Sequence, residues 1–305
     1  MRLPLRTFAL KKIFDIGMSF PVLQLFLALV GIFAIAYFFI GVLLLVCQNR
    51  LLFFPSREIQ TMPGDVGLVY EDVWLSVSNE VGKEERLHGW WIPGAFARDN
   101  FLLYLHGNGE NIGANVHHAK RFQELGFSVF LIDYRGYGQS EGRFPVEKRV
   151  YQDAEVAWNY LVRERGIRVK DIFIYGHSLG GAIAIDLASR HPDMAGAIVQ
   201  SSFTSIWDML DFQPIYYRLF PKRLFIHQRF DSISKVKSLR MPILLIHGIC
   251  DRTVPATMSQ ALFDGITAPK ELWLVPDAAH NNVASVSGWQ YQDKIKEFLA
   301  RVRGE

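Results

Sequence analysis

Residues 171–185 have the sequence DIFIYGHSLGGAIAI, an apolar run followed by a glycine-rich turn and a series of small residues. The spacing Gly176-x-Ser178-x-Gly180 within it is typical of a sharp strand-to-helix turn that exposes a serine hydroxyl. Such a turn leaves no room for side chains beside the serine, and glycines satisfy that steric demand. The motif alone also occurs by chance, so its meaning depends on the residues at the ends of neighbouring strands.

Short apolar segments alternate with helical patterns along most of the chain. An antiparallel pair is expected at residues 73–77 and 87–92, because both segments are alternating or rich in aromatic residues. This order predicts an α/β fold, in which helices flank both faces of a mostly parallel central sheet. Later strands are expected at 101–105, 128–132, 172–175, 197–200, 243–247 and 271–275, and helices at 114–125, 147–165, after Ser178 and at 291–302.

Polar residues gather where the predicted strands end. Ligands of such sheets bind beyond the carboxyl ends of the strands, so these residues are candidates for a functional site. They are His106, Asp133, Ser178, Ser201, Asp251 and His280.

The formal net charge of +3 comes from the N-terminus of this 305-residue chain. Arg2, Arg6, Lys11 and Lys12, set against Asp15, account for the whole excess, so the remainder is neutral. A binding surface for nucleic acid is therefore not expected.

Residues 16–49 contain no Asp, Glu, Lys or Arg, and an apolar run of about 20 residues is long enough to cross a bilayer. A cleaved signal peptide is the alternative, but its apolar core would be shorter and end in a small-x-small pattern. A lipoprotein signal would place a small residue before its cysteine, and Val46, which precedes Cys47, is too bulky. We predict a basic tail at 1–20, a transmembrane anchor at 21–47, a linker at 48–67 and a globular domain at 68–305.

The charges around the anchor predict its orientation. Four basic residues precede it, whereas Arg50 and Arg57 follow it closely. The positive-inside rule then places the N-terminus in the cytoplasm and the large domain outside it, facing the periplasm if the protein is bacterial.

Residues 203–239 interrupt the alternation of strands and helices with a segment rich in aromatic side chains. Two interpretations stay open. Irregular helices could pack these aromatics against one another, or the segment could form a small cap that lines an apolar pocket for an acyl or aryl group.

Three motifs together resemble the α/β-hydrolase superfamily, and in particular its membrane-anchored ABHD-like members. They are His106-Gly-Asn108, Asp133-Tyr-Arg-Gly-Tyr-Gly-x-Ser140 and Gly176-His-Ser-Leu-Gly-Gly181. The resemblance covers about residues 68–303 and is specific for the superfamily but not for a substrate. It implies an α/β-hydrolase domain with a cap at about 203–239, and a loop at 133–140 that supports the site.

Ser178 is the expected nucleophile, and it needs a base within hydrogen-bonding reach. His280, after the strand at 271–275, is the candidate base. The order Ser…Asp…His in the family implies that Asp251 is the acid that orients this histidine. Asp277 is the nearest rival, but it lies on the same loop as His280, from which the far ring nitrogen is hard to reach.

Acyl transfer also needs donors that stabilise a developing oxyanion. The turn after Ser178 offers the backbone N–H of Leu179, and the resemblance implies the N–H of Asn108 as the second donor. His106, His177 and His247 are expected to have structural roles.

We expect neither a cofactor nor a metal ion. His117 and His118 are adjacent on a helix and face apart, and residues 133–140 lack the Gly-Lys-Ser/Thr ending of a phosphate loop. The predicted function is a membrane-anchored serine hydrolase that cleaves an ester or thioester of a hydrophobic, lipid-like or small acyl substrate. A peptidase or amidase with the same triad, or a hydrolase fold kept as a binding module, are the alternatives.

Overall fold

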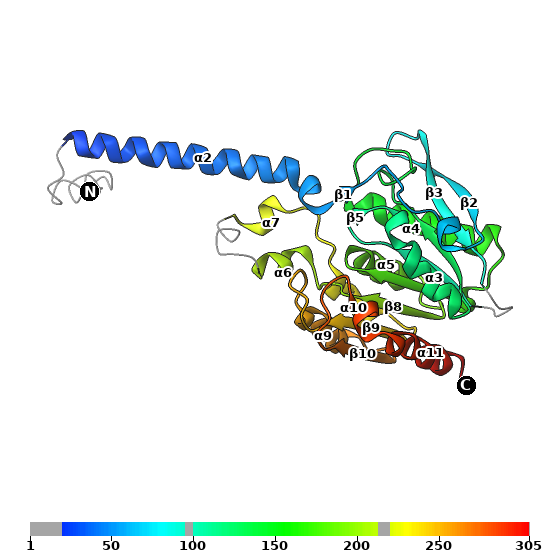
Figure 1. The fold of residues 1–305 in the computed structure, drawn as a ribbon. Coiled ribbons are helices and arrows are strands. Elements are labelled where there is room, and N and C mark those ends of the chain that lie inside the picture. The colour runs from blue at the N-terminus through cyan, green and yellow to red at the C-terminus, as the bar shows by residue number, and fades with distance from the viewer. Residues whose placement is uncertain (1–19, 95–99, 213–219, 305) are drawn as a thin grey trace, which may run out of the picture.

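An eight-stranded sheet forms the centre of the computed structural model, which describes residues 20–94, 100–212 and 220–304 (Figure 1). Its strand order is β10-β9-β8-β7-β4-β6-β3-β2, and the six strands β10, β9, β8, β7, β4 and β6 are parallel to one another. The remaining two, β3 and β2, form the antiparallel edge. The strands are β2 (Glu71–Ser78), β3 (Glu84–Ile92), β4 (Phe101–Leu105), β6 (Ser128–Ile132), β7 (Ile172–His177), β8 (Gly196–Gln200), β9 (Ile243–Gly248) and β10 (Lys270–Val275).

Helices cover both faces of this sheet. Successive strand residues point to opposite faces, so Leu103 and Leu105 of β4 enter one buried cluster while Leu102 and Tyr104 enter the other. The first cluster is closed by α4, α5 and α9, and the second by α3, α10 and α11. The helices of this domain are α3 (Val116–Glu124), α4 (Glu147–Asn159), α5 (Leu179–Arg190), α6 (Ile206–Asp211), α7 (Lys222–Phe225), α8 (Ser232–Lys235), α9 (Ala256–Gly265), α10 (Val283–Ser287) and α11 (Trp289–Arg303).

The predicted α/β fold with a mostly parallel sheet is confirmed, and the ends of the predicted elements lie within three residues of the observed ones, with one exception. The helix predicted at 147–165 is the exception, because α4 ends at Asn159 and the chain continues as a π-helical turn over Tyr160–Glu164. The switch in backbone hydrogen bonding leaves no mark in the side-chain periodicity, so the sequence could not show it.

Helix α2 (Phe20–Leu52) projects away from the sheet (Figure 1). It has 33 residues, a mean hydropathy of 2.8 in its most apolar window and 6% of that window buried. Within the described residues it is the helix that is long and apolar enough to cross a membrane.

The residues after α2 lie against the domain. Strand β1 (Phe54–Pro55) pairs in parallel with β5 (Gly109–Glu110). Further along, Asn111 donates its side-chain amide to the carbonyl of Glu58, and Lys120 donates to the carbonyl of Val66. The segment predicted as a linker is thus hydrogen-bonded to the domain at several points.

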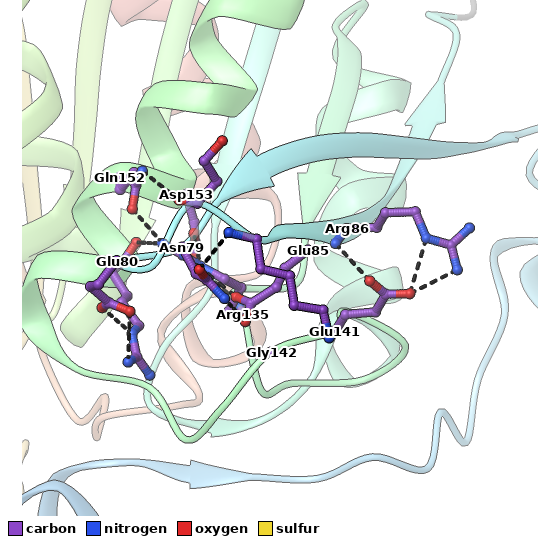
Figure 2. Close-up of polar contacts among 12 residues, drawn as sticks. Asn79, Glu80, Glu85, Arg86, Arg135, Glu141, Gly142, Gln152 and Asp153 are labelled. Atoms are coloured by element: carbon purple, nitrogen blue, oxygen red, sulfur yellow. Dashed lines mark hydrogen bonds and ion pairs between the residues drawn. The ribbon is translucent and has the colours of Figure 1, made fainter.

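A buried arginine fixes the loop that follows β6 (Figure 2). The side chain of Arg135 is fully buried, and its Nε donates to Asp153 Oδ1 at 2.7 Å while its backbone N–H donates to Oδ2 at 2.8 Å. Gln152 accepts a further bond at 2.7 Å, and Glu85 lies 3.6 Å from the guanidinium. Nearby, Arg86 holds Glu141, so the loop is bound to both α4 and the β2–β3 hairpin.

Replacing Asp153 by alanine should strongly destabilise the fold. The change leaves the buried Arg135 without its main counter-charge, and breaking a buried pair in this way costs about 3–5 kcal/mol. The thermal unfolding midpoint, followed by tryptophan fluorescence of the full chain in detergent, measures the loss. Glu80→Ala is the matched control, because it removes an ion pair whose carboxylate is half exposed. Equal midpoints for the two variants would contradict this account.

Candidate active site

Ser178 lies on a strained turn between β7 and α5. Its backbone has φ 53° and ψ −117°, a conformation that side chains rarely adopt. A Cβ on Gly176 would lie 2.2 Å from the carbonyl oxygen of Gly180, and one on Gly180 would lie 2.1 Å from that of Leu105. Neither contact is sterically possible, which explains both glycines of the motif.

The structure brings the three predicted triad residues together. His280 Nε2 is 3.0 Å from Ser178 Oγ, and His280 Nδ1 is 2.7 Å from Asp251 Oδ2. The three side chains come from different loops, after β7, β9 and β10, at the same edge of the sheet. Asp277, the rival acid, is exposed on the loop that carries His280.

Several donors hold the Asp251 carboxylate in its ionised form. Oδ1 accepts the backbone N–H groups of Thr253 and Val254, both at 2.8 Å, and His247 Nε2 lies 3.2 Å from Oδ2. Burial alone would raise the pKa of Asp251, but hydrogen bonds from His247, His280 and Val254 outweigh it and bring the pKa well below its usual range. A stable negative charge therefore faces the His280 ring.

His177 contacts the loop of His280 from the other side. Its Nε2 donates to the backbone carbonyl of His280 at 3.0 Å, which fixes the loop after β10. Burial, together with the neighbouring His280, lowers the pKa of His177 to about 3, so this ring stays neutral.

Asn108, a predicted oxyanion donor, lies on the turn after β4. His106 Nδ1 is 2.8 Å from the carbonyl oxygen of Gly107, and burial lowers the His106 pKa to about 4, so the neutral ring carries its proton on Nδ1. The peptide between Gly107 and Asn108 is trans, so its N–H points away from that carbonyl. Leu179, the other predicted donor, is the first residue of α5, where helix N–H groups lack intrahelical acceptors.

Residues beyond the predicted site hold Asn108 in place. Its carbonyl oxygen accepts from the backbone N–H of Phe54 at 2.8 Å and from the Tyr137 hydroxyl at 2.7 Å. Its side-chain amide donates to the carbonyl of Leu52 at 2.9 Å. Sequence analysis missed Leu52 and Phe54, because β1 is too short to show a periodic pattern and its partner lies more than 50 residues away.

A cavity of about 470 Å³ opens beside Ser178. The described residues of 203–239, expected as a possible cap over an acyl pocket, contribute none of its lining. The lining mixes polar and apolar groups: Tyr104, Gly107, Asn108, Gly109, Glu110, Ala114, Asn115, His118, His177, Ser178, Thr253, His280 and Asn281.

Side chains that could bind a metal ion do not cluster among the described residues of this region. Across residues 20–94, 100–212 and 220–304, no three His, Cys, Asp or Glu side chains come together in a way that could hold an ion. His118 lines the cavity, but burial lowers its pKa to about 4 and leaves it neutral.

Comparisons with known proteins show what the chain is similar to. Residues 97–230 match the family model described as serine aminopeptidase, S33. Alpha/beta hydrolase domain-containing protein WAV2 of Arabidopsis thaliana is 31% identical over 243 residues, which cover 73% of this chain and 77% of that protein. Human alpha/beta hydrolase domain-containing protein 17B is 32% identical over 203 residues, or 66% of each chain.

Solved structures share the fold. The esterase Pf2001 of Pyrococcus furiosus superposes with a TM-score of 0.67 and 23% identity, covering 81% of this chain and 98% of its own. The acylaminoacyl peptidase of Pyrococcus horikoshii gives a TM-score of 0.59 with 15% identity, and the match covers 77% of this chain and 41% of that one. Fold and sequence thus define a hydrolase of the α/β class. The chain belongs to the α/β-hydrolase superfamily.

The low pKa of Asp251 predicts a pH-dependent contribution to stability. A carboxyl whose pKa is lower in the folded state stabilises the fold above its unfolded pKa, here the ordinary value of 3.8, and loses that effect as the pH falls further. Asp251→Asn should therefore lower the unfolding midpoint at pH 7, and the gap to the wild type should narrow below about pH 4. Asp277→Asn, at an exposed position, should leave the unfolding midpoint unchanged both at pH 7 and below pH 4. A gap that stays constant down to pH 3 would count against this assignment.

Proposed function

We propose that this protein is a membrane-anchored serine hydrolase that cleaves an ester or thioester through Ser178, His280 and Asp251. One observation carries the proposal, namely the continuous relay from Ser178 Oγ through the two nitrogens of His280 to Asp251 Oδ2, with contacts of 3.0 and 2.7 Å. A serine hydroxyl becomes a useful nucleophile only beside a base that is itself oriented by a third group.

The first half of the proposed reaction acylates the enzyme. His280 Nε2 takes the proton of Ser178 while Oγ bonds to the substrate carbonyl carbon. The N–H groups of Asn108 and Leu179 stabilise the resulting oxyanion, with help from the positive end of the α5 dipole. The intermediate collapses as the bond to the leaving oxygen or sulfur breaks, and His280 returns the proton to that atom.

The second half uses water. His280 removes a proton from a water molecule, whose oxygen attacks the acyl carbon, and the Ser178–acyl bond breaks as Oγ regains the proton. Asp251 stays ionised throughout and stabilises the transient imidazolium.

Two features favour an ester with a hydrophobic acyl group. Asn108, Gly109 and Glu110 line the cavity and are hydrogen-bonded or paired to residues 52–55, which join the apolar helix α2 to the domain. A substrate held in a lipid surface would thus enter close to the anchor. The similarity in fold to a protein named as an esterase is consistent with ester chemistry.

A peptidase is the second candidate, because residues 97–230 match a family model described as a serine aminopeptidase. Such an enzyme needs a carboxylate to hold a free amine, and Glu110 is the carboxylate among the described residues that line the cavity. The same triad would serve both reactions. A non-catalytic binding module is disfavoured, because it would not need the complete relay or the strained Ser178.

Ser178→Ala should lower ester hydrolysis by on the order of 10⁴-fold, leaving only the contribution of binding and the oxyanion donors. The variant should also lose labelling by a fluorophosphonate probe while keeping its thermal unfolding midpoint. Assays on short-chain and long-chain esters, thioesters and aminoacyl amides measure the loss and rank the substrate classes. Ser234→Ala, at an exposed serine on α8, is the control and should behave as the wild type. Near-normal turnover by Ser178→Ala would refute the mechanism.

We further propose that α2 spans the membrane, with the N-terminus in the cytoplasm and the domain outside it. The four basic residues ahead of the helix and its exposed apolar surface support this arrangement.

Protease added to sealed cells, or to spheroplasts if there is an outer membrane, should digest the domain and spare a tag at the N-terminus. The reason is that the positive flank of the helix resists translocation. Immunoblotting against a tag at each end of the chain shows which end the protease has reached. Digestion of the domain only after lysis would show the opposite orientation.

A further inference from the structure

Helix α7 and the residues beside it pack along the C-terminal half of α2, the half nearer the domain (Figure 1). The Phe220 ring stacks on Tyr37 with centroids 4.5 Å apart and planes within 12° of parallel. Phe225 fills the space above Gly41, where a Cβ would come within 2.5 Å of its ring. Gln48 Oε1 accepts the backbone N–H groups of His227 and Gln228 at 2.8 and 3.1 Å.

These contacts fix the depth of α7 along the proposed anchor. Tyr37 and Gly41 both lie inside the segment predicted to cross the membrane, and Gln48 follows directly after it. At about 1.5 Å per residue, the contacts extend about 16 Å along the helix axis. Suppose that only about the first 20 residues of α2 occupied the hydrocarbon core of the bilayer. The boundary of that core would then lie near Ile40, between the Tyr37–Phe220 and Gly41–Phe225 contacts.

Apolar and basic side chains are exposed on this segment and on the neighbouring end of α6, as in helices that lie in a membrane interface. Leu224 is 66% exposed, and Phe212, at the end of α6, is 57% exposed. Lys222 connects the two helices through Asp211 and the carbonyl of Trp207. The neighbouring Arg223 is also exposed, and a long basic side chain beside apolar ones can reach the headgroups while its stem stays in lipid.

We propose that the α7 segment, residues 220–225, inserts its apolar side into the bilayer interface beside α2, with Leu224 in contact with lipid. This second membrane contact rests on the proposed role of α2 as an anchor. Continuity with the apolar surface of α2 identifies a phospholipid bilayer as the occupant.

The contact would also fix how the domain sits on the membrane. Glu147, the first residue of α4, accepts the backbone N–H groups of Arg229 and Phe230 at 2.6 and 2.8 Å. Its own N–H donates to Gln228 Oε1 at 2.5 Å. Since the segment after α7 is bound to α2 at one end and to α4 at the other, the domain would not rotate freely about its anchor.

Depth-dependent fluorescence quenching tests the proposal on the full chain. The two free cysteines, Cys47 and Cys250, are first replaced, and a single cysteine is then introduced as Leu224→Cys. An environment-sensitive fluorophore is attached to this new cysteine. Two matched sites are Phe33→Cys, on the exposed surface of α2, and Val81→Cys, an exposed apolar residue on the β2–β3 turn. The proteins are reconstituted into phosphatidylcholine–phosphatidylglycerol vesicles with and without doxyl-labelled lipid.

Doxyl lipid should quench the probes at positions 224 and 33 and spare the probe at 81. Quenching at 33 with none at 224 would overturn the α7 proposal and leave the anchor intact. Absence of quenching at 33 would instead refute the anchor.

A second comparison tests the packing that holds α7. Gly41→Leu should displace Phe225 and remove most of the quenching at position 224, whereas Gly31→Leu should not, because nothing lies within 4 Å of a Cβ there. Equal quenching in the two variants would mean that α2 does not hold α7 in lipid.

Discussion

The close approach of α5 to the end of β4 is the contact on which the rest of the site depends. It is possible only because Gly180 carries no side chain, since a Cβ there would lie 2.1 Å from the carbonyl oxygen of Leu105. The turn from β7 into α5 likewise requires Gly176, whose Cβ would lie 2.2 Å from the carbonyl oxygen of Gly180. That approach holds Ser178 at positive φ, with its hydroxyl facing His280, and places Ser178 against Gly107 on the turn after β4. The strain is sustained because β7 is paired on both sides and α5 is almost wholly buried.

Charge is distributed unevenly around this turn. Asp251 keeps its negative charge because two backbone N–H groups and His247 surround it, whereas burial keeps His106 and His177 neutral. Each neutral ring then acts as a fixed donor to a backbone carbonyl, one beside the proposed oxyanion site and the other on the His280 loop. The arrangement restricts movement around His280 and leaves its ring as the group available to exchange a proton with Ser178.

The apolar helix is joined to the site through hydrogen bonds rather than a loose tether. The Leu52 carbonyl accepts from the side-chain amide of Asn108, and the Phe54 N–H donates to the backbone carbonyl of Asn108. Tyr137 adds a third bond from a loop that Arg135 holds in place. On the other side, Gln48 and Gly41 hold the segment around α7. The segment at 203–239 therefore contacts α2 through its described residues instead of lining the cavity, which a count of its aromatic side chains could not reveal.

The sequence by itself determined the α/β fold, the apolar helix and the strand-to-helix turn that carries Ser178. It could do so because strand–helix alternation, charge depletion and the glycine spacing around Ser178 are local patterns. Only the tertiary structure decided which acid faces His280, how the Asn108 peptide is oriented and where the aromatic segment packs. Those outcomes depend on contacts between segments far apart in the chain, such as Phe54 with Asn108 and Phe225 with Gly41, and no local periodicity encodes them.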